Sequence, residues 1–210
     1  MRRIALATVG VLVALFVASQ LLVPPYVEHR VASRLTADGG HAQVQVSAFP
    51  AFTLLTGHGD RLRVRAQGIN LSLAIPVAGQ TGPRLDQLDK FGTVDIRVTG
   101  ANAGPFKLSS LSVERAGGAR DYTVAVDATT TAADLATYTG GQIAGDLGGL
   151  FGSFAGSALP FADQPVPINV NSVVHSDGGS PVVVSTTGAI AGIPLDPLIQ
   201  ALSAALAGRL

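Results

Sequence analysis

Apolar residues recur at every second position in most segments between residues 42 and 190, and this pattern limits the possible folds more than any other feature. In the first such segment, Val44, Val46 and Ala48 alternate with polar residues. Side chains of a strand point alternately to its two faces, so the pattern is typical of strands with one face in a core and the other in solvent. The sequence therefore predicts a large sheet with one buried face.

Strands with this pattern are bounded by turns that contain glycine or proline. The predicted strands are 42–48, 61–66, 69–75, 94–98, 106–113, 122–128, 166–175 and 181–190. Ser109-Ser110 interrupts one of them, as a β-bulge would. Gly117-Gly118 and residues 176–180 each predict a hairpin turn. Pro165 and Pro167 predict that strand 166–175 lies at a sheet edge.

Helical spacing appears before, between and after the strands. Residues 25–38 follow Pro24-Pro25, which we expect to stop one helix and to start the next. The apolar stripe predicted for this second helix consists of Tyr26, Val27, Val31 and Leu35. A single helical turn is predicted at 85–88, inside a long connection.

Two further helices are predicted in the second half of the chain. Residues 132–155 keep helical spacing despite many glycines, and Thr131 precedes them as a capping residue. Asp196-Pro197 starts a C-terminal helix that ends near Gly208. With the strands, these helices predict an α+β fold.

The N-terminus is a targeting or anchoring segment. Ile4 to Val23 is a run of 20 residues without a charge, which is long enough to cross a bilayer as a helix. Arg2 and Arg3 precede the run, and the positive-inside rule places them in the cytoplasm and the rest of the chain outside it. An uncleaved transmembrane anchor and a cleaved signal peptide both fit. We therefore divide the chain into residues 1–24, the anchor or signal segment, and residues 25–210, a single folded domain.

Charge and composition exclude several function classes. The chain has 14 Lys and Arg against 14 Asp and Glu, so it lacks the basic excess that nucleic-acid binding needs. It has no cysteine, which excludes disulfides, thiolate metal sites and thiol catalysis. No serine has glycine at both the second position before it and the second after it, as a hydrolase nucleophile elbow requires.

The histidines have no spacing that would ligate a metal. They are His29, His41, His58 and His175. We expect a monomeric protein that is not an enzyme and has no metal or cofactor. A hydrolase with an unrecognised site stays open as a minor alternative.

Three features suggest binding, and each also has an ordinary structural explanation. Arg61, Arg63 and Arg65 share one face of a strand, where guanidinium groups could bind a phosphate or simply face water. The apolar turn at 49–55 either exposes its aromatic residues or caps the core. The aromatic end of helix 132–155 either moves to admit a ligand or packs in the core.

Two stretches of the sequence carry a resemblance to a known family. Tyr26-Val-Glu-His-Arg-Val-Ala-Ser-Arg-Leu and the following segment from Val44 to Val64, with its Phe-Pro turn, form the first. The second is Pro167-Ile-Asn-Val-Asn-Ser-Val with the Asp177-Gly-Gly hairpin. These stretches resemble the LmeA-like phospholipid-binding family of actinobacterial cell envelopes. The resemblance implies a non-enzymatic envelope protein whose strongly curved antiparallel sheet, a half-barrel of the tubular lipid-binding kind, wraps around two or three helices.

Two function hypotheses follow from the residues and the resemblance together. The first is an extracytoplasmic protein that binds or carries phospholipid and supports the assembly of envelope lipid or lipoglycan. Its candidate acyl-chain residues are Phe49, Phe52, Leu54, Leu55, Leu135, Ile143, Leu147, Phe151 and Phe154. Its candidate headgroup residues are Arg61, Arg63 and Arg65. The second hypothesis is a membrane-anchored structural domain that docks another envelope protein.

Overall fold

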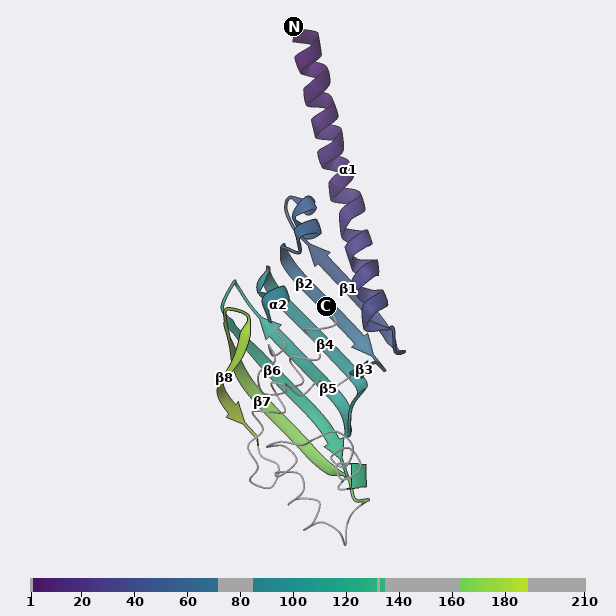
Figure 1. The fold of residues 1–210 in the computed structure, drawn as a ribbon, viewed down its shortest axis with the longest axis vertical. Helices are drawn as coiled ribbons and strands as arrows, with labels where there is room; N and C mark the ends of the chain where they lie inside the picture. The colour runs from purple at the N-terminus through teal and green to yellow at the C-terminus, as the bar shows by residue number, and fades with distance from the viewer. Residues whose placement is uncertain (1, 72–84, 132, 135–162, 189–210) are drawn as a thin grey trace.

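The computed structural model describes residues 2–71, 85–131, 133–134 and 163–188, with the backbone alone for residues 2–18. Within these residues the fold is α+β, with one large sheet and few helices (Figure 1). The helices are α1 (Arg2–Leu35), η1 (Ala51–Thr56, a 3-10 helix) and α2 (Asp86–Asp89). The strands are β1 (His41–Ser47), β2 (Gly59–Gln67), β3 (Asn70–Leu71), β4 (Phe91–Ala103), β5 (Phe106–Arg115), β6 (Asp121–Thr130), β7 (Val166–Asp177) and β8 (Ser180–Thr187).

The sheet is mixed and open. Its strand order is β1-β2-β4-β5-β6-β7-β8, with the short β3 pairing with β4, so β1 and β8 form opposite edges. The prediction of an antiparallel sheet is wrong at two strand pairs, because β2 and β3 both run parallel to β4. A parallel pair needs a long crossover, and the connection from β2 to β4 is long enough to return the chain to the end at which β2 starts. The strong curvature implied by the resemblance stays a prediction.

The alternating pattern predicted the strands well. Each predicted strand has a counterpart, although only Asn70–Leu71 of segment 69–75 is described as a strand and β4 is longer than expected. The register shifts between Leu108 and Ser110, which confirms the predicted bulge. Gly117 and Gly118 both adopt positive φ in the turn between β5 and β6, where glycine has no steric penalty.

The predicted edge position of strand 166–175 is wrong, since β7 pairs with both β6 and β8. However, β8 pairs with β7 only from Asn171 onward, whereas Pro167 pairs with Thr129 of β6 alone. Proline has no backbone N–H, but at Pro167 this removes no hydrogen bond to β8, because the described part of β8 does not pair with that residue.

The predicted break at Pro24-Pro25 is also wrong, because α1 is a single helix that contains both prolines. A proline inside a helix removes a hydrogen bond and costs about 3 kcal/mol. Side chains at four-residue spacing, Val27, Val31 and Leu35, pack on the core and compensate for this loss. Tyr26 was assigned to the same stripe incorrectly: its side chain is 59% exposed. In the part of the chain that the structure describes, no helix has the length and hydropathy of a membrane span.

The helices lie at defined places around the sheet. α1 packs along β1, and the backbone N–H of Val46 donates to the Glu28 carboxylate at 2.9 Å. α2 confirms the predicted helical turn at 85–88 within one residue. Of the helix predicted at 132–155, only residues 133–134 are described. They are helical, and the Asp134 N–H donates to the Thr131 hydroxyl at 3.0 Å, which confirms the cap. The C-terminal helix lies outside the described residues.

The core lies on one face of the sheet, and the opposite face, which we call the outer face, carries the polar residues. In β2, Leu62, Val64 and Ala66 are buried on the core face, whereas Arg61 and Arg65 are exposed on the outer face. This alternation follows directly from the sequence pattern. It places every side chain of the predicted arginine row in or near solvent.

Candidate functional site

The arginine row forms as predicted on the outer face of β2. Its cross-strand neighbours follow from the register: Arg61 pairs with Ser47 and Thr93, Arg63 with Gln45 and Asp95, and Arg65 with Gln43 and Arg97. Directly paired residues in neighbouring strands have side chains within contact range. The row is therefore part of a polar grid that extends over β1, β2 and β4.

One arginine of the row is held by an acidic partner. Arg63 Nε lies 3.2 Å from one carboxylate oxygen of Asp95, and Arg97 Nε lies 3.2 Å from the other. Arg97 also donates to Glu114 at 3.0 Å. Asp95 is therefore shared by two guanidinium groups, and Arg63 and Arg97 are both partly neutralised.

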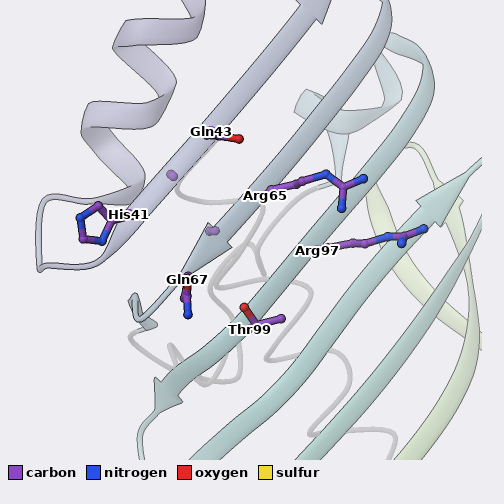
Figure 2. Close-up of a pocket in the computed structure, with 8 residues that line it drawn as sticks. His41, Gln43, Arg65, Gln67, Arg97 and Thr99 are labelled. Carbon is purple, nitrogen blue, oxygen red and sulfur yellow. The ribbon is translucent and has the colours of Figure 1, made fainter.

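A shallow pocket of about 410 Å³ opens on the outer face at the end of the arginine row. We call it the arginine pocket. Figure 2 shows Arg65 and Arg97 extending in the same direction from adjacent strands, with Gln67 and Thr99 side by side below them. The residues that line it are His41, Ala42, Gln43, Arg65, Ala66, Gln67, Arg97 and Thr99. Sequence reasoning identified Arg65 but missed Arg97, because the parallel pairing of β2 with β4 has no local sequence signal.

The apolar turn exposes most of its large side chains. Phe49 is 75% exposed, Phe52 52% and Leu55 65%, and we call these three residues the apolar tip. Leu54, by contrast, is buried in the core, so it is not part of this exposed surface, and its role as an acyl-chain residue stays a prediction. The 3-10 helix allows this split, because about three residues per turn point Phe52 and Leu55 in one direction and Leu54 in another.

The apolar tip lies at a distinctive place in the fold. η1 packs beside α1 at the end of the sheet from which the N-terminal part of α1 extends (Figure 1). On α1, Leu21 and Leu22 are also about 70% and 68% exposed. Arg61 follows η1 closely in the chain and is exposed near the same end. Exposed apolar residues next to a cation are therefore gathered where the long helix leaves the domain.

The remaining candidate acyl-chain residues cannot be placed, because Leu135, Ile143, Leu147, Phe151 and Phe154 lie outside the described residues. Of the four candidates in the described part, Phe49, Phe52 and Leu55 are exposed and Leu54 is buried. The described residues contain no cluster of His, Asp and Glu that could hold a metal ion.

A buried polar cluster that the sequence did not reveal closes the end of the sheet near η1. Arg115 of β5 is 5% exposed, forms an ion pair with Asp89 at 3.2 Å and donates to the Leu88 carbonyl at 3.1 Å. The Tyr122 hydroxyl donates to Asp89 at 2.7 Å, and the Ser176 hydroxyl donates to its other oxygen. The Arg115 guanidinium also lies 5.0 Å from the Tyr122 ring centroid. This cluster fastens α2 to three strands, which is a structural role.

Burial raises the pKa of Tyr122 well above its usual value, and the hydrogen bond to Asp89 adds to this effect. In the unfolded chain a tyrosine ionises at about pH 10. Above that pH the unfolded state loses a proton that the folded state keeps, so folding is progressively destabilised as the pH rises. We expect the free energy of unfolding to fall above about pH 10, and to fall less in Tyr122→Phe. Urea titrations across this range measure the effect, and parallel curves for the two proteins would contradict it.

Comparison of the chain with protein families, with curated proteins and with solved structures gives no match.

Proposed function

We propose that this protein binds phospholipid at the extracytoplasmic surface of a membrane, with the N-terminal half of α1 as its anchor or signal segment. The observation that carries the proposal is the location of the apolar tip. Phe49, Phe52 and Leu55 are exposed in and next to η1, which packs beside α1 at the end of the sheet from which the uncharged N-terminal part of α1 extends. The resemblance to the LmeA-like family supports the same class of ligand.

The chemistry of this end suits the membrane interface. Aromatic and large aliphatic side chains partition to the boundary between headgroups and acyl chains, and a nearby cation adds attraction to anionic lipids. Arg61 is exposed near the apolar tip and supplies that cation. Arg2 and Arg3, at the far end of α1, support a location of the folded domain outside the cytoplasm, by the positive-inside rule. The lipid ligand would serve the assembly of envelope lipid or lipoglycan.

The absence of tryptophan from the sequence allows a direct test. In the full chain reconstituted into phospholipid nanodiscs, Phe52→Trp introduces a single tryptophan at the apolar tip. We expect blue-shifted emission and strong quenching by phospholipids brominated on their acyl chains, because the indole would lie at the level of those chains. Fluorescence titration with brominated lipid measures this.

Val184→Trp is the matched control, because Val184 is an apolar residue of β8 with a similar exposure, 63%. Its tryptophan should emit as in water and should resist quenching. An unquenched tryptophan at 52, or equal quenching at both positions, would refute the proposed orientation.

A second candidate function, a domain that docks another envelope protein, is favoured by a different observation. β8 is an edge strand of the described sheet, and Val182 and Val184 on it are 48% and 63% exposed. An open strand edge with exposed valines can pair with a strand of a partner. The two functions are compatible, since β8 and the apolar tip lie on different parts of the molecule (Figure 1).

A further inference from the structure

The arginine pocket is a second binding site, separate from the apolar tip. We propose that it binds the phosphate group of a soluble phosphate ester. Arg65 and Arg97 line it from adjacent strands, and none of its lining residues is acidic (Figure 2). Its volume of about 410 Å³ falls in the usual range of small-ligand sites.

The charge distribution around the pocket favours an anion. Directly paired like charges in neighbouring strands repel each other, and Arg65 pairs directly with Arg97. Arg97 is compensated by Asp95 and Glu114. Arg65, in contrast, makes no ion pair with any described residue, and it is exposed. An anion that contacts both guanidinium groups would remove this repulsion.

The shape of the donor set indicates phosphate. Guanidinium groups bind phosphate oxygens through two parallel hydrogen bonds, and a phosphate has further oxygens to satisfy. The neutral side chains of Gln43, Gln67 and Thr99 surround the arginines. None of these three side chains makes a hydrogen bond within the described part of the protein, so their donors are available. His41 lies at the rim of the pocket and adds one more donor (Figure 2).

The arginine pocket lies away from the end of the sheet that carries the apolar tip. If the tip contacts the membrane, as the proposed function states, the pocket is distant from the bilayer. Arg61 and Arg65 are four residues apart on β2, and a strand rises about 3.3 Å per residue, so Arg65 lies roughly 13 Å along the strand from Arg61, the residue of the row nearest to the apolar tip. This distance exceeds the Debye length of about 8 Å at physiological ionic strength. Headgroups of the bilayer beneath the tip are therefore out of reach, and a soluble ester is the ligand that fits.

The test follows His41 by NMR in the full chain, held in uncharged detergent micelles at constant pH. Glycerol phosphate is the probe, and glycerol without phosphate is the control ligand. We expect a saturable shift of the His41 ring resonance with glycerol phosphate alone. The ring of His58, which lies just beyond η1, should not shift.

Three variants make the test specific. Arg65→Gln and Arg97→Gln should each weaken binding by about tenfold or more, the usual effect of losing a charged hydrogen bond. Arg65→Gln is the cleaner variant, because it breaks no described ion pair. Lys107→Gln removes the same charge from the outer face of β5, away from the pocket, and should leave binding unchanged.

Each other result would overturn the proposal. If Lys107→Gln weakens glycerol phosphate binding as much as Arg65→Gln does, the anion responds only to the overall electrostatic field of the protein. No saturable shift of His41, or a shift that survives Arg65→Gln, would mean that the pocket is not a phosphate site. A His41 shift in phosphatidylglycerol nanodiscs relative to phosphatidylcholine nanodiscs, without response to glycerol phosphate, would make a bilayer headgroup the ligand. The tryptophan quenching test is independent of these results, so the two proposals can fail separately.

Discussion

Asp89→Ala should destabilise the fold by about 3–5 kcal/mol, the usual cost of breaking a buried ion pair from one side. The Arg115 side chain is only 3% exposed, and without Asp89 its charge would stay buried without a carboxylate. Tyr122 and Ser176 would lose their acceptor in the same step. Urea unfolding of a chain that begins at Gln20, which keeps the α1 side chains that pack on the sheet, measures this loss.

Two further proteins distinguish the buried pair from an ordinary surface charge. Asp121→Ala removes a carboxylate that is 59% exposed and pairs with His175, and should cost less than about 1 kcal/mol. A double replacement, Asp89→Leu with Arg115→Met, should recover most of the stability, since apolar residues of similar volume can replace a buried pair. Equal losses for Asp89→Ala and Asp121→Ala would mean that the cluster does not hold the end of the sheet.

The strands were predictable because their signal is local. Alternation of period two is visible within a few residues, and it correctly assigns both faces of β2. The bulge at Ser109-Ser110 and the turn at Gly117-Gly118 were predictable for the same reason, since each depends on neighbouring residues.

Features that depend on distant residues were not predictable. The parallel pairing of β2 with β4 brings Arg97 beside Arg65, although 31 residues separate them along the chain. Asp89, Arg115 and Ser176 meet only because α2 and the ends of β5 and β7 share one end of the sheet. The prolines of α1 were misjudged because local propensity favours a break, whereas packing on the core maintains the helix.

The structure also divides the predicted arginine row into three different environments. Arg61 lies near the apolar tip, Arg63 is paired with Asp95, and Arg65 lines the arginine pocket. The sequence predicted a common role, because all three side chains share one face of one strand. Along the strand, however, they are spread over more than a Debye length. One ligand therefore cannot engage them equally, and substituting them one at a time is more informative than replacing all three together.

The largest effect on membrane binding should come from replacing Phe49, Phe52 and Leu55 together with serine. All three side chains are exposed in the free protein. Partial burial of one such side chain in the bilayer would contribute about 1 kcal/mol to the free energy of membrane binding. The three together correspond to about a hundredfold loss of affinity. Flotation with phosphatidylglycerol vesicles of the chain that begins at Gln20 measures this, because this chain lacks most of the uncharged N-terminal segment and depends mainly on the apolar tip.

The matched control for this prediction is the double variant Val182→Ser with Val184→Ser, which removes exposed apolar surface from β8 instead. It should float as the parent chain does. Arg61→Gln should weaken flotation at low salt and have little effect at high salt, because a surface charge acts on anionic lipid through a screened field. If the serine variant of the apolar tip floats like the parent, or the β8 variant loses binding instead, the membrane does not contact the tip. The β8 edge would then be the surface through which this domain binds its partners.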